Sequence, residues 1–136
     1  MRLLIVGLLS CVSAIVFVYS VANAQTPIVD NETAVRQAKL FAGESGKNLC
    51  IDAAINNKAQ AEHLRKNKVS VAALCGCVER ELFTLVSVKF ATTLLVEAQA
   101  ADAQKDPSKI SQSSVDQLTR LEGVANLDCF QKLMRP

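Results

Sequence analysis

The stretch LCGC at residues 74–77, followed by a largely apolar run as far as residue 101, decides the fold predicted for this chain. Two cysteines two positions apart cannot readily bond to each other, because so small a ring strains the disulfide geometry. On a helix their side chains point about 200° apart, so they face different neighbours. We therefore expect Cys75 and Cys77 each to bond to Cys50 or to Cys129, which would pin a central helix on both sides.

Residues 1–24 are predicted to be a signal peptide. Arg2 is their only charged residue, residues 3–21 are almost continuously apolar, and Ala22-Asn23-Ala24 supplies the small residues that a signal peptidase reads. Because the apolar run approaches the length that spans a bilayer, a retained N-terminal anchor is the alternative. Either outcome exports residues 25–136, so we expect a periplasmic or secreted protein.

The exported part has the size and composition of one small helical domain. It has 112 residues, which suffice for a single core. Its 14 basic and 13 acidic residues leave no basic excess for nucleic-acid binding. It contains no Trp or Tyr and few Gly or Pro, which disfavours aromatic binding platforms and a β-sandwich. We predict an all-α fold, a small disulfide-stapled bundle of three to four helices.

Two helices are predicted before the LCGC stretch. The first covers residues 31–42 and ends at Gly43. The second starts a few residues later and breaks near Asn56 and Asn57, because paired asparagines are unfavourable inside a helix. Such a break would bring Cys50 within reach of the LCGC stretch. The alternatives are an extended return of the chain, or a Cys50 that has no partner there.

Two further helices are predicted after it. Ser70 caps a long third helix over residues 71–101, although residues 82–90 are rich enough in β-branched side chains to allow a strand instead. After a polar connection, Ser114 begins the last helix with the spacing of a capping box, and Gly123 is a possible break within it.

The cysteines are the only residues with a recognisable chemical pattern. Four cysteines in a small exported domain predict two structural disulfides, formed by Cys50, Cys75, Cys77 and Cys129. The alternative is a redox pair of Cys75 and Cys77, since a strained bond between them would be easily reduced. The single histidine, His63, lies in a polar run without further ligands, so we expect no metal site. No catalytic or cofactor-binding residue is predicted.

The order of these cysteines resembles that of a group of small exported bacterial proteins. The shared pattern is an early cysteine, then C-x-C at the head of an apolar helix, then a last cysteine near the C-terminus; here it runs from Cys50 to Cys129. Those proteins have no assigned function, so the resemblance implies no site.

Composition and motifs together favour an exported, non-enzymatic interaction protein of the inhibitor, immunity, chaperone or assembly-accessory type. The expected partner is another protein, with no nucleic acid and no membrane contact except through residues 1–24 if these are not cleaved. The alternative function is a thiol-disulfide redox protein that uses Cys75 and Cys77. A third hypothesis places the basic run at residues 58–68 against anionic lipid, but that run lacks an apolar flank.

Overall fold

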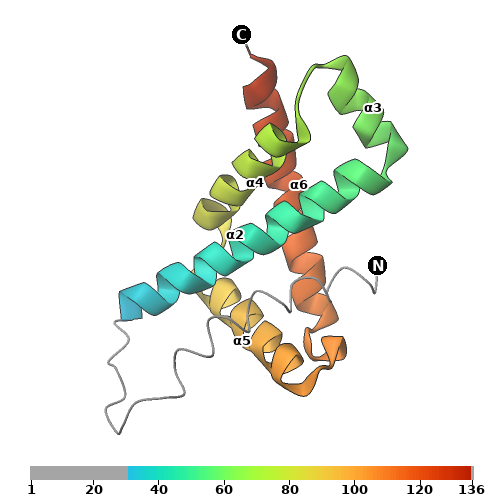
Figure 1. Cartoon of the computed structure of the whole chain (residues 1–136). Coiled ribbons are helices and arrows are strands. Elements are labelled where there is room, and N and C mark those ends of the chain that lie inside the picture. Colours follow the sequence, from blue (N-terminus) through green and yellow to red (C-terminus); the bar gives the residue numbers. More distant parts are fainter. Residues whose placement is uncertain (1–30, 136) are drawn as a thin grey trace, which may run out of the picture.

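The computed structural model describes residues 31–135, which form helices joined by short connections (Figure 1). In chain order the elements are α2 (Asn31–Asn56), α3 (Lys58–Lys66), α4 (Val71–Leu85), α5 (Val88–Gln104), the 3₁₀ turn η2 (Pro107–Lys109) and α6 (Gln112–Met134). The predicted all-α, disulfide-linked fold is confirmed, with five α-helices in the described residues in place of three to four. These residues contain no strand, so the alternative for residues 82–90 is wrong. The predicted signal peptide, residues 1–24, lies outside them.

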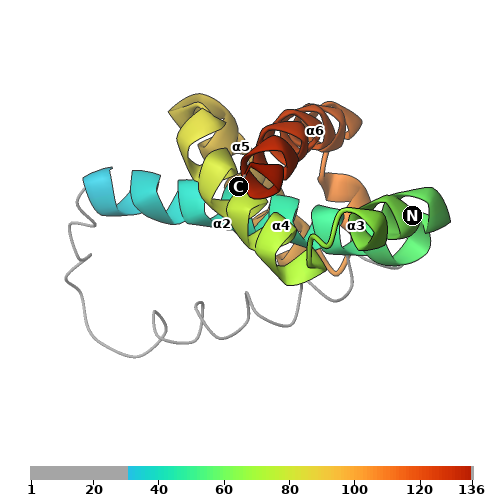
Figure 2. The ribbon, with the colours of Figure 1, turned by 90° about the horizontal axis from the view of Figure 1, so that it is seen from above.

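Helix α2 contacts each of the other four α-helices, and α4 contacts both α2 and α6. In Figure 1, α2 crosses the whole body diagonally, and the view from above in Figure 2 shows α5 and α6 on the same side of it. Leu74, Val78 and Leu82 of α4 are fully buried in the core between these helices. The central helix is thus α2, while the helix with the CGC motif lies between α2 and α6.

Helix α2 runs without interruption through the glycine predicted to end it, so the predicted stop at Gly43 is wrong. Every fourth position along its buried side carries a small residue: Ala38, Ala42, Gly46, Cys50 and Ala54. A Cβ atom on Gly46 would lie 1.8 Å from Leu82 Cδ1, and one on Gly43 would lie 2.8 Å from the carbonyl oxygen of Glu79. The two glycines therefore allow α4 to pack closely against α2, and they do not end the helix.

The predicted break at the asparagine pair is confirmed. Helix α2 ends at Asn56, and the Asn57 side chain caps α3 by accepting hydrogen bonds from the backbone N–H groups of Ala59 (3.1 Å) and Gln60 (3.2 Å). After α3 the chain turns back toward α2, and Ser70 caps α4 as predicted, accepting from the N–H of Ala73 at 3.1 Å.

The apolar run 71–101 forms two helices where one was predicted. Val86 has an extended backbone, with φ −69° and ψ 132°, and its side chain is buried. The hydroxyl of Ser87 then accepts a hydrogen bond from the N–H of Phe90 at 3.2 Å and starts α5. Because a serine cap satisfies backbone donors only at a helix start, it stabilises the break. Helix α5 consequently leaves α4 in a new direction (Figure 1).

The last helix begins three residues earlier than predicted. Ser111, not Ser114, is its cap, and its hydroxyl accepts from the N–H of Ser114 at 3.2 Å. The carboxylate of Glu97 on α5 accepts from the Ser111 N–H (3.1 Å) and hydroxyl (3.2 Å), which ties the two helices together. Gly123 does not interrupt α6, so the possible break there is wrong.

Candidate functional site

Both disulfide bonds form as predicted, and they leave α4 toward different neighbours. Cys50–Cys75 joins α2 to α4 with Cα atoms 5.6 Å apart, and Cys77–Cys129 joins α4 to α6 with Cα atoms 5.8 Å apart. Three of these cysteines are fully buried, and Cys77 is 9% exposed. The two bonds fasten α2 and α6 to α4, and they indicate an oxidising environment of the extracellular type.

The pairing also bears on the thiol chemistry. Cys75 and Cys77 each bond to a distant cysteine and not to each other. Cysteines that exchange disulfides are partly exposed in an electropositive setting, whereas these are almost completely shielded from solvent. The four cysteines therefore lack the exposure that disulfide exchange requires.

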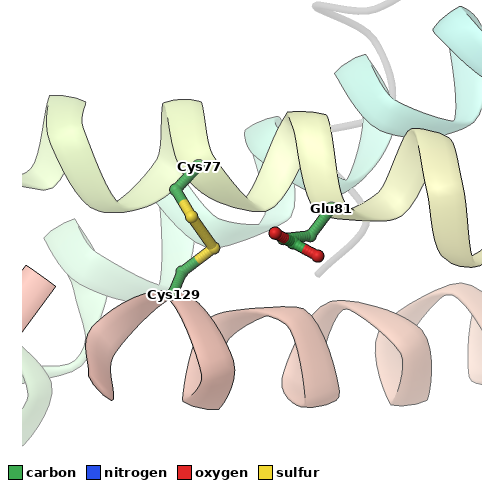
Figure 3. Close-up of side chains that lie close together, drawn as sticks. All are labelled: Cys77, Glu81 and Cys129. Atoms are coloured by element: carbon green, nitrogen blue, oxygen red, sulfur yellow. A yellow bond between two sulfur atoms is a disulfide. The ribbon is translucent and has the colours of Figure 1, made fainter. Parts of the chain in front are cut away.

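One group of side chains brings potential metal-ligating atoms together: Cys77, Glu81 and Cys129, whose donor atoms lie within 4.8 Å of one another (Figure 3). Two of these atoms are the sulfurs of a disulfide, and a metal binds cysteine as the free thiolate. The third belongs to the Glu81 carboxylate, which pairs with Lys132 Nζ at 2.6 Å. The group is therefore a disulfide beside an ion pair, and we assign it no metal.

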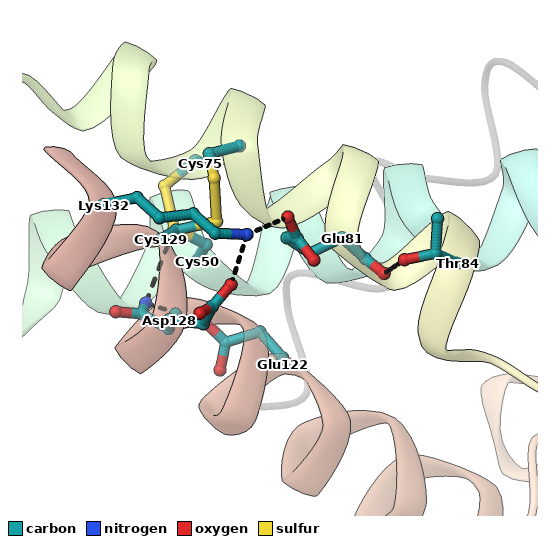
Figure 4. Close-up of a disulfide and its surroundings, with 10 residues drawn as sticks. Cys50, Cys75, Glu81, Thr84, Glu122, Asp128, Cys129 and Lys132 are labelled. Atoms are coloured by element: carbon teal, nitrogen blue, oxygen red, sulfur yellow. Dashed lines mark hydrogen bonds and ion pairs between the residues drawn. A yellow bond between two sulfur atoms is a disulfide. The ribbon is translucent and has the colours of Figure 1, made fainter.

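Lys132 connects the C-terminal part of α6 to α4, close to the disulfides (Figure 4). Its ammonium group lies 2.6 Å from Glu81 on α4 and 2.6 Å from Asp128 on its own helix. The hydrogen bond to Asp128, and then that to Glu81, raises the pKa of Lys132. Since this cluster is largely solvent-exposed, it orients the end of α6 and contributes little to stability.

A groove of about 370 Å³ lies where α2, α3, α4 and α6 meet. It is lined mainly by apolar groups: Ala53, Gln60, His63, Leu64, Leu74, Glu122, Gly123, Asn126, Leu127 and Phe130. The His63 ring on α3 stacks on the Phe130 ring on α6, with the ring centroids 4.8 Å apart and 28° between the planes. This contact joins α3 to α6, so the groove depends on the turn at Asn57 that folds α3 back.

Glu122 and Asn126 supply polar groups in the α6 wall. The Asn126 side-chain amide donates to Glu122 Oε1 at 3.0 Å and lies 3.8 Å from Cys50 Sγ, next to the first disulfide. Burial raises the pKa of Glu122, and the hydrogen bond from Asn126 offsets this only in part. The groove therefore holds a carboxyl group whose ionised form is poorly solvated.

The raised pKa of Glu122 predicts how pH affects stability. The folded state binds the proton more tightly than the unfolded state, so ionisation lowers stability as the pH rises through the ordinary glutamate pKa of about 4.3 and beyond it. The substitution Glu122→Gln removes this penalty and keeps an oxygen that accepts from Asn126. We expect it to raise the melting temperature at neutral pH. The difference in melting temperature between the variant and the wild type should vanish at a pH below the ordinary glutamate pKa. A difference that persists there would show that the raised pKa of Glu122 is not its cause.

The sequence predicted properties of some of these residues, but not that they lie together in a groove. His63 is exposed, as predicted, but its contact with Phe130 joins residues 67 positions apart and leaves no mark in either local sequence. The spacing of Val124, Leu127 and Phe130 predicts one apolar face of the last helix. In the structure Phe130 packs against the core, while Val124 is 59% and Leu127 63% exposed. The spacing of Gln60, His63 and Leu64 places them on one side of α3, which is the only local signal of the groove.

None of the described helices has a stretch that is long and apolar enough to cross a membrane. The fold and the groove define a disulfide-linked helical protein with a concave apolar surface at the junction of four helices. No protein-family model matches the chain, and no curated protein or solved structure matches it.

Proposed function

We propose that this chain is an exported, non-enzymatic protein of the periplasm or the exterior, and that it binds another protein through the groove between α2, α3, α4 and α6. An inhibitor, an immunity protein, a chaperone or an assembly accessory would each work in this way. The observation that carries the proposal is the apolar groove with an exposed apolar rim on α6.

The rim has the features of a protein contact surface. Leu127 is 63% exposed at the edge of the groove, and Val124, one turn earlier on the same helix, is 59% exposed. Clustered apolar side chains on the surface of a soluble domain commonly mark an interaction site. Beside them lies the stacked pair of His63 and half-buried Phe130, and phenylalanine is among the residues enriched at protein interfaces.

The disulfides support the same function by keeping the groove in shape. Cys50–Cys75 joins two of the four helices around the groove, and Cys77–Cys129 joins α4 to the helix that carries the rim. A surface that is already rigid loses less conformational entropy on binding. Structural disulfides of this kind are typical of exported proteins, and the small-residue signature at residues 22–24 is consistent with export.

The proposal is tested by capture of a partner with matched variants. The exported chain, purified without reductant, is immobilised and exposed to the exported proteins of its source cell. Leu127→Glu places a charge on the rim, and we expect it to reduce retention of the partner at least tenfold. Val96→Glu is the control, because Val96 is 58% exposed on α5, which does not line the groove. Equal retention by both variants and the wild type would contradict the proposal.

The redox alternative is tested with the same preparation. Disulfide reductase and isomerase turnover is measured beside a simple dithiol at equal concentration. Since all four cysteines are buried or nearly so, we expect no turnover above that of the dithiol. Turnover well above it, lost in a Cys75→Ser variant that keeps its fold, would replace the binding function with a thiol-disulfide one.

A further inference from the structure

Within residues 31–135, no cation pairs with Glu122 in the groove. The ion pairs among the described residues involve Glu62, Glu79, Glu81 and Asp128, and the Glu122 carboxylate accepts a hydrogen bond from the neutral amide of Asn126. A carboxylate offers about four lone-pair positions on two oxygen atoms, so most of its acceptor capacity remains open. The groove therefore contains an acidic group that is partly desolvated and that its own helices do not neutralise.

The basic residues of α3 do not supply the missing charge. Gln60, His63 and Leu64 of this helix line the groove. At about 100° per residue, Lys58 and Arg65 fall on the opposite side of the helix. Lys66 is also directed away and pairs with Glu62 at 3.2 Å. His63 is the remaining basic group at the groove, and its ring is stacked on Phe130.

We infer that the groove receives a lysine or arginine side chain of the partner protein, with an aliphatic residue of the same segment against the rim. The charged end would meet the Glu122 carboxylate, while the methylene stem would lie along Leu127 and Phe130. Long basic side chains commonly bury their stems on apolar surface and keep the charge at a polar group. Charge complementarity and the apolar rim together select this occupant, and the inference rests on the proposed function.

The form of the groove favours a protein segment over a small molecule. Pockets for small ligands enclose most of the ligand surface. Here His63, Gly123 and Leu127 are themselves exposed, so the groove is open along one side. An open groove with a single charged group suits one side chain that is held in place by contacts of its neighbours outside the groove.

The test uses acetylated, amidated tripeptides that have leucine at both ends and lysine, norleucine or glutamate in the middle. Each is titrated to millimolar concentration into the isotope-labelled exported chain, and backbone amide shifts are followed by NMR. We expect the lysine peptide to bind about fivefold more tightly than the norleucine peptide. Its shifts should centre on Gln60, His63 and Leu127. Added salt should reduce this preference, because it screens the ion pair.

Two variants test whether Glu122 is the acidic group that the lysine peptide contacts. Glu122→Gln is expected to abolish the preference for lysine without loss of fold. Asp116→Asn removes the same charge from α6 at an exposed position that accepts from Gln112 Nε2 at 2.8 Å and does not line the groove. We expect Asp116→Asn to keep the preference.

Several results would overturn the inference. One is a lysine peptide that binds no more tightly than the norleucine peptide, and another is a glutamate peptide that binds more tightly than both. A third is that the peptides cause no amide shifts at the groove. Finally, amide shifts at the groove that depend on protein concentration without peptide would make a second copy of the chain the occupant. The proposed function is judged separately. If Leu127→Glu reduces retention of the partner while Glu122→Gln leaves both retention and peptide binding unchanged, the function stands and the inference is wrong. If neither substitution affects retention, both are wrong.

Discussion

Removal of the Cys77–Cys129 bond by the double substitution Cys77→Ala and Cys129→Ala is expected to lower the free energy of unfolding by about 4 kcal/mol. The two cysteines are 52 positions apart, so the bond closes a long loop and restricts the unfolded chain strongly. Alanine is chosen because a buried serine hydroxyl would add its own desolvation cost. Urea unfolding, followed by far-UV circular dichroism, measures the loss, which is a large part of a small domain's stability of about 5–15 kcal/mol.

The matched control is the double substitution Cys50→Ala and Cys75→Ala. These cysteines are 25 positions apart, and the shorter loop predicts a loss of about 3.5 kcal/mol. A larger loss of unfolding free energy in the Cys77 and Cys129 variant than in the Cys50 and Cys75 variant would support the dependence on loop length. The comparison is matched because both bonds are buried and both attach to α4. Unchanged stability in either variant would show that the corresponding bond does not fasten its helix.

Gly46→Ala is expected to lower the free energy of unfolding by about 2 kcal/mol, although alanine is the better helix former. The new methyl group would lie 1.8 Å from Leu82 Cδ1, so the Leu82 side chain must shift, and because Leu82 is fully buried it can shift only against its neighbours in the core. Overpacking of this kind costs about 3 kcal/mol at the upper end of its usual range. The higher helix propensity of alanine returns about 1 kcal/mol.

Gly123→Ala is the control for this prediction. Gly123 also lies inside a helix, but a Cβ atom there would meet no atom within 4 Å. Only the propensity difference remains, so we expect a gain of about 1 kcal/mol. The same substitution is thus expected to lower the free energy of unfolding at Gly46 and to raise it at Gly123. Thermal unfolding of both variants measures these changes. A gain at both positions would mean that α2 and α4 are not in close contact at Gly46.

Two of the incorrect sequence predictions concern Gly43 and the start of α5. The sequence predicts a helix end at Gly43 because glycine is common at helix ends. In the structure the place of Gly43 inside α2 depends on how closely α4 approaches, and α4 follows 28 residues later. The break at Ser87 does have a local signal, since serine is a favourable cap. That signal lies inside an apolar run whose periodicity suits one continuous helix equally well, and burial of Val86 decides between the two.

The groove could not be predicted, because its walls come from four helices and its polar group is ordinary in sequence. Glu122 lies between Leu121 and Gly123 on α6, and nothing in this local sequence distinguishes it from a solvent-facing glutamate. Its partial burial and raised pKa arise only after α6 is fastened to α4. The stacking of His63 on Phe130 depends likewise on the position of α3 after the turn at Asn57.

The sequence by itself determined the helical class, the break at Asn56 and Asn57, the cap at Ser70, and the use of all four cysteines outside the predicted signal peptide in disulfides. These features depend on groups that are close along the chain: a side chain that accepts from the backbone a few residues later, or two cysteines too near each other to bond. Only the tertiary structure decided that α2 is continuous, which cysteines pair, and that an unpaired carboxylate lies in an apolar groove. Each of these depends on the distance between helices, and that distance is set by the size of the side chains that meet there.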